Sequence, residues 1–460
     1  MTPTLTLIAL YMLLQLGIGV WVSRRIKTEA DYLVAGRKLG YTLLTFSIFA
    51  TWFGAETVIG SAGSVYSEGI SLASPEPFGY GLCLILMGLV FAAPLWRRKL
   101  TTLADLFRQR FSATVERTAA IVLIPTSILW AAAQVRAFGQ VISAGSTLEV
   151  EVAIGIAAAA TIAYTVFGGL LVDAITDVIQ GGILILGLVT IGVMTVLNLG
   201  GPAAAASAVA ESGRIVSPSA VHPGLLAGLE AWAIPVCGSV IATELVGRVI
   251  AARSAVVARR SSLAAGGLYL LVGLIPVFVG VTGAGLALDL AHPEQLLPTV
   301  AETTLSTIGY AIFAGGLLSA ILSTVDSTLL ISSGLLSHNV IVPALRDPSE
   351  RIKVLVARSG VLAFGIIAYL LALRAEGVLD LVEQASAFGS AGTLVAVTFG
   401  LFTRFGGPRA ALATLIAGVA SYLLGLVWGA PYPFLLSLAT SLLVYAAVAT
   451  FEPRVTSRAT

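Results

Sequence analysis

Apolar runs of about twenty residues recur along almost the whole chain, and each is long enough to cross a bilayer as an α-helix. We expect thirteen such spans, near residues 5–23, 41–71, 77–96, 118–145, 149–169, 173–199, 224–250, 261–288, 304–336, 354–374, 380–403, 407–429 and 432–451. Only 11% of the residues are charged, whereas a soluble domain carries about 25%. The sequence therefore predicts an all-α polytopic membrane protein.

The basic residues predict its orientation in the cell membrane. If the N-terminus is outside and the C-terminus is cytoplasmic, all but three of the 26 Lys and Arg residues fall in cytoplasmic loops or tails. The exceptions are Arg136, Arg214 and Arg374. In this map Arg248 belongs to a cytoplasmic loop. The positive charges are explained by topology, so they do not indicate nucleic-acid binding.

A polar stretch, SAILSTVDSTLL at 319–330, lies inside one of the apolar runs. Four of its small or polar residues share one helical face, with Asp326 at the edge of that face; the five are Ala320, Ser323, Thr324, Asp326 and Ser327. A carboxylate and hydroxyls at membrane depth are costly unless they line a binding site, and hard oxygen ligands suit sodium. Alternatively, the small residues allow close helix packing, which explains the hydroxyls but not Asp326.

Two spans are interrupted near their middle. The stretch 47–69 contains Gly54, Glu56, Gly60 and Gly63, and the stretch 231–249 contains Pro235, Gly238 and Glu244. These spans open two blocks of five, and interrupted helices in matching positions are typical of inverted-repeat transporters with midplane binding sites. We expect an N-terminal helix and loop at 1–40, repeats at 41–199 and 224–404, an extracellular connector at 200–223, and two final helices with a short cytoplasmic tail at 405–460.

A third polar cluster, FGGLLVDAITDVIQ, occupies residues 167–180. Gly168 and Gly169 predict a tight turn between two spans. Asp173 follows near the interface, where it could cap the next helix. Asp177 lies deeper in the span and is the better functional candidate, with a purely structural hydrogen bond as the alternative.

Together, ATWFGAETVIGSAG, GGLLVDAITDVIQ and SAILSTVDSTLL resemble motifs of the sodium:solute symporters, in the order and spacing of that family. The resemblance spans nearly the whole chain. It implies the leucine-transporter-type fold, with 13 transmembrane helices that include a 5+5 inverted repeat. It also implies sodium as the coupling ion and no cofactor.

The resemblance implies particular sodium ligands. The main site of the family uses two carbonyls of the first interrupted span and residues of the polar stretch; the matching positions are Ala50, Phe53, Ala320, Ser323 and Thr324. Some members bind a second sodium, and the matching positions are Asp177, Ser323, Asp326 and Ser327. Many members have an uncharged residue at the position of Asp326, and the extra carboxylate favours two sodium ions here. Alternatively, Asp326 is neutral or paired with a basic residue.

The substrate residues resemble two branches of the family. Trp52, Tyr80 and Trp130 are similar to positions that form the cation cage of choline-type transporters, where aromatic faces surround a quaternary ammonium. Ala242 departs from that type, which has a further tryptophan. Arg136 instead resembles carriers of proline, pantothenate and sialic acid, because a buried arginine suits a carboxylate.

The complete candidate substrate set is Trp52, Glu56, Tyr80, Trp130, Arg136 and Glu244. A structural alternative pairs Arg136 with Glu56 or Glu244. We expect a sodium-coupled symporter that imports a small zwitterion or carboxylate (an amino acid, a betaine-like compound or a monocarboxylate) by alternating access. Choline or another organic cation is the alternative substrate, and a proton could replace sodium. A sodium-responsive sensor or a channel-like pore is the alternative of another class.

An enzyme is not expected, because the sequence offers no convincing nucleophile–base pair. His222, His292 and His338 fall in expected loops, where we expect solvated side chains. The expected partners are the solute, sodium ions and the lipid bilayer, with the protein functional as a monomer.

Overall fold

The computed structural model describes residues 27–452 apart from 72–74, 145–147, 168, 216–223, 284–289, 291–292 and 376, and a few residues before 27. In this described part, all named elements are helices. Ten helices are long and apolar enough to cross a membrane, or eleven when a pair bent by 58° is counted as one span. The expected span at 5–23 lies mostly outside the described residues, so the count of thirteen stays a prediction.

Helices are expected in a membrane protein, because a chain in lipid must form its backbone hydrogen bonds internally. The unbroken helices are α8 (Ala113–Ala144), α9 (Val150–Phe167), α10 (Leu170–Asn198), α14 (Ala255–Thr282), α16 (Thr307–Leu336), α17 (Glu350–Arg374), α19 (Ser390–Phe402), α20 (Pro408–Val427) and α21 (Pro433–Phe451). A further span joins α5 (Phe78–Leu86) to α6 (Ala92–Arg97) through a π-helical turn. Shorter helices include α7 (Ala104–Arg110) and α18 (Val378–Ala387).

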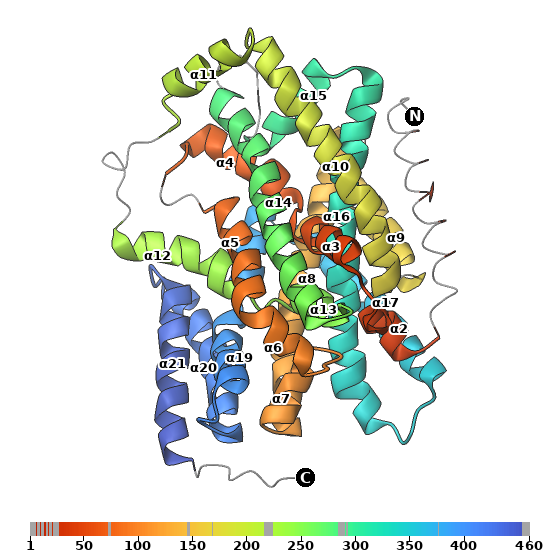
Figure 1. Ribbon diagram of the computed structural model, residues 1–460, viewed down its shortest axis with the longest axis vertical. Coiled ribbons are helices and arrows are strands. Elements are labelled where there is room, and N and C mark those ends of the chain that lie inside the picture. The colour runs from red at the N-terminus through yellow and green to blue at the C-terminus, as the bar shows by residue number, and fades with distance from the viewer. Residues whose placement is uncertain are drawn as a thin grey trace.

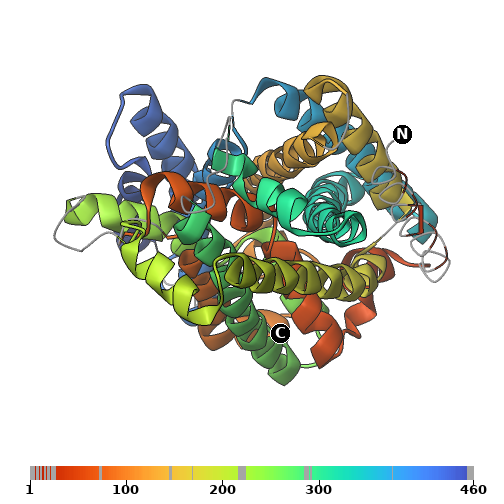
Figure 2. The same ribbon diagram turned by 90° about the horizontal axis from the view of Figure 1, so that it is seen from above.

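Helix α16, which carries the polar stretch, lies in the interior of the bundle. It packs against α8 and α10, and Figure 2 shows it nearly end-on among the other helices. Glycines permit the close approach to α10, because a Cβ at Gly316 would lie 3.1 Å from backbone atoms of Leu184. The polar residues of α16 are therefore buried in protein instead of facing lipid.

Both expected interruptions are present. The first separates α3 (Tyr41–Trp52) from a π-turn at Glu56–Gly60 and α4 (Ser61–Glu68). The second separates α12 (Leu225–Ala233) and a π-turn at Ile234–Gly238 from α13 (Thr243–Ala251). Helices α3 and α13 both contact α16 (Figure 1). The first break therefore lies beside the polar stretch, where Thr324 contacts the Thr51 carbonyl. The π-turn of the second break packs against α5, α18 and α19 instead.

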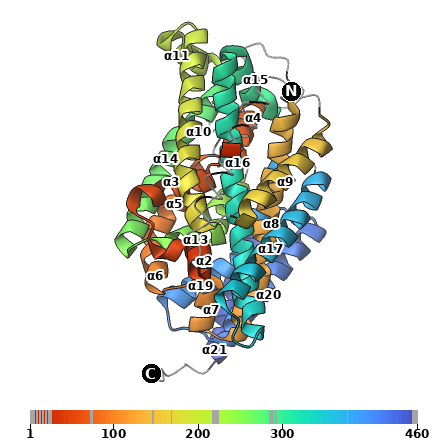
Figure 3. The same ribbon diagram turned by 90° about the vertical axis from the view of Figure 1, so that its right-hand side faces the viewer.

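The remaining helices flank this centre. Helices α20 and α21 pack against each other and against α19, on one side of the molecule in Figure 1. Helices α8, α9 and α17 pack together, as Figure 3 shows from the side. The expected connector at 200–223 contains a short helix, α11 (Pro202–Glu211).

Two sequence-based placements are wrong. Arg248 does not lie in a loop: it belongs to α13, four residues after Glu244, and its side chain is fully buried. His338 is not a solvated loop residue, because the helix continues past α16 as a π-turn. Its Nδ1 lies 3.1 Å from Glu29 Oε2, and its Nε2 lies 3.4 Å from Asp105 Oδ1. His222 and His292 lie outside the described residues.

Candidate functional site

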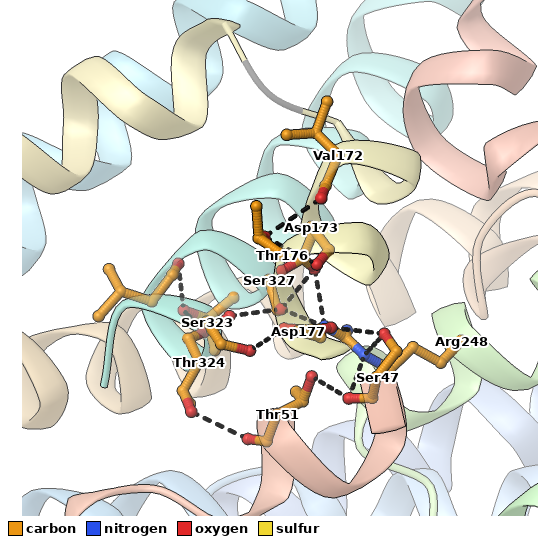
Figure 4. A network of polar contacts seen from close by, with 12 residues as sticks. Ser47, Thr51, Val172, Asp173, Thr176, Asp177, Arg248, Ser323, Thr324 and Ser327 are labelled. Carbon is orange, nitrogen blue, oxygen red and sulfur yellow. Dashed lines mark hydrogen bonds and ion pairs between the residues drawn. The ribbon is translucent and has the colours of Figure 1, made fainter. Parts of the chain in front are cut away.

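Four charged side chains meet at the centre of the bundle, and we call them the buried charge cluster: Asp173, Asp177, Arg248 and Asp326. All are fully buried. Arg248 Nη2 lies 2.7 Å from Asp173 Oδ2 and 3.4 Å from Asp177 Oδ2 (Figure 4). Asp173 and Asp177 are one helical turn apart on α10, which places both carboxylates on the same face.

Hydroxyls from α3 and α16 complete this network. Ser47 Oγ donates to Asp177 Oδ2 at 2.6 Å, and Ser323 donates to the other oxygen of Asp177. Ser327 Oγ donates to Asp173 Oδ2 at 2.8 Å. Arg248 Nε donates to the Ser47 carbonyl oxygen at 3.1 Å. Four helices, α3, α10, α13 and α16, are therefore joined by one set of polar contacts (Figure 4).

Asp326 differs from the other members, because neither carboxylate oxygen has a hydrogen-bond partner among the described residues. The Thr165 hydroxyl lies beside it but donates to the Thr161 carbonyl oxygen at 2.9 Å. Asp173, Asp177 and Arg248 are its electrostatic neighbours. Three carboxylates thus face one guanidinium, and a buried excess of negative charge requires a cation or protons.

The residues expected at the main sodium site lie where α16 meets the end of α3. Thr324 Oγ1 donates to the Thr51 carbonyl oxygen at 3.0 Å. Ala50 is fully buried, and Phe53 has the non-helical angles φ −91° and ψ 69° that end α3. Ala320 belongs to α16, one turn before Thr324. The structure therefore brings together the two segments that supply this set.

The three expected aromatic residues also come together. The ring centroids of Trp52 and Trp130 are 5.8 Å apart, and those of Tyr80 and Trp130 are 6.0 Å apart in an edge-to-face arrangement. All three side chains are buried. The Tyr80 hydroxyl lies 3.0 Å from Ser386 Oγ. These residues form an aromatic cluster beside the first break.

The two glutamates are not paired with Arg136. Gln134 Nε2 donates to Glu56 Oε2 at 2.7 Å, and Ser127 donates to Glu244 Oε1. Arg136 Nη1 donates to the Ala372 carbonyl oxygen at 3.0 Å. No ion pair among the described residues joins Arg136 to either glutamate. The structural alternative offered by the sequence is therefore not what the structure contains.

A cavity of about 740 Å³ opens between α4, α8, α15 (Leu296–Thr304) and α16. Its lining includes Arg136, Gln140, Gly60, Tyr310 and Phe313. A second, much smaller cavity of about 10 Å³, lined by Glu56 and Ala137, shares Ile59, Gly60 and Gln140 with it. Arg136 therefore faces a space large enough for a small organic molecule, and Glu56 lines the smaller cavity beside it.

Sequence reasoning missed two members of the buried charge cluster. Arg248 was assigned to topology, and Asp173 to helix capping. Both had a signal in their spacing, since Arg248 follows Glu244 by four residues and Asp173 precedes Asp177 by four. A buried charge inside a membrane helix needs a partner of opposite sign. Arg248 of the first pair and the aspartates of the second were therefore candidates for an ion pair.

Comparisons with known proteins identify the family and the fold. Residues 32–418 match the sodium:solute symporter family. The human high affinity choline transporter 1 is 28% identical over 403 residues, which cover 81% of this chain and 68% of that protein. The sodium/proline symporter of Haemophilus influenzae is 27% identical over 444 residues, which cover 91% and 87%. The solved structure of a substrate-bound, outward-open, Na⁺-coupled sialic acid symporter shares the fold, with a TM-score of 0.87 and 18% identity over 99% of each chain.

Proposed function

Because the chain belongs to the sodium:solute symporter family, we propose that it couples the entry of sodium to the import of a small zwitterion or carboxylate. It is a multi-pass membrane transporter of the leucine-transporter type, with sodium as the coupling ion, and not an enzyme. The observation that carries the substrate proposal is the cavity of about 740 Å³ with Arg136 in its wall.

The main sodium site is formed by the carbonyls of Ala50 and Phe53 with Ala320, Ser323 and Thr324. Support comes from the contact between Thr324 and the Thr51 carbonyl, which holds α16 against the end of α3. The unwound backbone at Phe53 has a carbonyl that is not committed to a regular helix. An ion bound here would link the two segments and stabilise one arrangement of them.

The second sodium site uses Asp177, Ser323, Asp326 and Ser327. Arg248 is closer to Asp173 than to Asp177, so it neutralises Asp173 first. Two carboxylates of the buried charge cluster then remain for cations. This excess of negative charge at the second site supports the binding of a second sodium ion there.

For the solute, Arg136 binds a carboxylate as a bidentate partner. Trp52, Tyr80 and Trp130 are the proposed contacts for the remainder of the solute, although the large cavity is lined by other residues. Glu56 and Glu244 complete the set. An organic cation such as choline is the second candidate, favoured by the same aromatic cluster and by the likeness to the human choline transporter. Arg136 in the cavity wall supports the zwitterion or carboxylate as the first candidate.

We propose the architecture expected from the sequence, with repeats at 41–199 and 224–404, an extracellular connector at 200–223, and flanking segments at 1–40 and 405–460. The N-terminus is outside, the C-terminus is cytoplasmic, and the monomer in the lipid bilayer is the functional unit. Support for the two repeats comes from the two broken helices, each of which lies at the start of one repeat.

The coupling of sodium and solute transport then follows from thermodynamic linkage between the binding of the two ligands. Sodium binds the outward-open arrangement more tightly, and each ligand shifts the two states only by its differential affinity for them. Each sodium that enters contributes about 2.3 kcal/mol per 100 mV of membrane potential. The broken helices move against the other helices as a unit, which exposes the site to each side in turn.

Arg136→Ala tests the substrate assignment. We expect the half-saturating concentration of L-proline or another carboxylate-bearing solute to rise about tenfold or more, because a charge-assisted bidentate contact is lost. Sodium-driven uptake into proteoliposomes measures this, with choline as a carboxylate-free probe. Arg117→Ala, an exposed arginine on the same helix, is the matched control. An unchanged carboxylate affinity in Arg136→Ala would remove Arg136 from the site.

A further inference from the structure

The first broken helix holds a buried acceptor at its break, and we propose that the Glu56 carboxylate binds an N–H group of a protonated primary or secondary amine on the solute. This inference rests on the proposed function and narrows it. It favours amino acids over fully N-methylated betaines and over monocarboxylates without an amine.

Glu56 is held in place by one neighbour and left open on one oxygen. Its side chain is 1% exposed. Oε2 accepts a hydrogen bond from Gln134 Nε2 at 2.7 Å, and Gln134 is itself fixed because its Oε1 accepts from the Ala55 N–H at 3.2 Å. Oε1 of Glu56 has no partner among the described residues. A buried carboxylate with one oxygen that accepts no hydrogen bond destabilises the protein, unless a ligand supplies the missing donor.

Gly54 makes room for this carboxylate. A Cβ at Gly54 would lie 2.6 Å from Glu56 Oε2 and 2.8 Å from Oε1. Both contacts are shorter than any side chain tolerates, so the carboxylate lies directly over the backbone of the break. The glycine here does more than permit an irregular turn: it lets an acidic group fold back onto the point where α3 ends.

The surroundings of Glu56 suit an ammonium group. Tyr80 lies within electrostatic range of Glu56 and of a second carboxylate, Glu76, whose Oε2 also has no partner among the described residues. Tyr80 stacks edge-to-face on Trp130. Aromatic faces beside carboxylates attract organic cations. Hard oxygen ligands for sodium lie elsewhere, around Thr324 and the buried charge cluster.

The position of Glu56 complements that of Arg136. Glu56 lines the small cavity of about 10 Å³ that shares Ile59, Gly60 and Gln140 with the large cavity, and Arg136 lines the large cavity. A solute with a carboxylate toward Arg136 would place its amine toward Glu56. A quaternary ammonium has no N–H group, so it cannot donate a hydrogen bond to Glu56 Oε1. The positive Arg136 and the negative Glu56 together therefore select for acids that carry an amine.

Matched ligand pairs on the purified full chain test this without any mutation. Thermal-shift titrations in sodium would compare L-proline with its N,N-dimethyl betaine, and L-alanine with its N,N,N-trimethyl betaine. We expect each parent amine to bind about tenfold or more tightly than its betaine, the factor for one hydrogen bond to a charged acceptor. Betaines that bind as well as their parent amines would overturn the inference but leave the proposed function standing. Sodium-dependent binding of choline with no binding of any of the four acids would overturn both.

The Glu56→Gln variant provides a second test. We expect it to reduce the preference for the amine over its betaine to within about twofold, because the variant lacks the charged acceptor that distinguishes an N–H group from a methylated nitrogen. Gly54→Ala should act in the same direction, because its Cβ displaces the carboxylate. Glu151→Gln, an exposed glutamate on α9, is the matched control and should keep the preference. A Glu56→Gln protein that binds sodium but retains the full preference would contradict the role of Glu56.

Discussion

Arg248→Ala is expected to cost the protein about 3–5 kcal/mol of stability, the range measured when one partner of a buried ion pair is removed. The substitution leaves Asp173 and Asp177 buried without their cation, and it removes the hydrogen bond from Nε to the Ser47 carbonyl. The helices α3, α10 and α13 would lose their shared contact. Thermal unfolding of the purified protein in detergent, followed by fluorescence, measures the loss.

Two further variants test whether the loss of stability depends on the guanidinium group of Arg248 and on its buried position. Arg248→Lys keeps the charge but cannot reproduce the planar set of donors, so we expect an intermediate loss of stability. Arg253→Ala removes an exposed arginine just after α13 and should leave the unfolding temperature unchanged. If Arg248→Ala were as stable as Arg253→Ala, the buried charge cluster would not hold the helices together.

Asp177→Asn is expected to raise the half-saturating sodium concentration by about tenfold or more. Asp177 accepts from Ser47 on α3 and from Ser323 on α16, so its two oxygens connect the helices that carry the proposed sodium positions. The amide keeps the shape of the side chain but removes the negative charge that attracts the ion. Uptake as a function of external sodium concentration measures the shift.

Asp173→Asn is the matched control, because Asp173 lies on the same face of α10 but pairs more closely with Arg248. It should lower thermal stability more than it changes the sodium dependence. If both variants shifted the sodium dependence equally, the division between a structural and a sodium-binding aspartate would be wrong.

The sequence predicted those features that depend on local pattern. Apolar runs predicted the helices, and the glycines near Glu56 and the proline near Gly238 predicted both breaks. The polar face of α16 was visible from spacing alone. The likeness of three motifs then indicated the fold and the sodium coupling that the family match supports.

Long-range pairings could not be read from the sequence in the same way. Arg248 looks like a topology determinant because charge counting cannot tell a loop arginine from one that faces Asp173 across the bundle. The sequence offered Glu56 and Glu244 as partners of Arg136, but no ion pair among the described residues joins it to either, because the direction of its side chain depends on how α8 is rotated. The contact between Gly54 and the Glu56 carboxylate depends on the geometry of the break, which no spacing rule supplies.

The central claim is that sodium drives uptake, and proteoliposomes with imposed gradients test it most directly. The probe is L-proline or L-alanine, whichever gives the larger sodium-dependent thermal shift. An inward sodium gradient at equal pH should drive accumulation of the solute, and an inside-negative potential should increase it. Accumulation driven by a proton gradient alone, at zero sodium and with no response to a sodium gradient, would contradict the account.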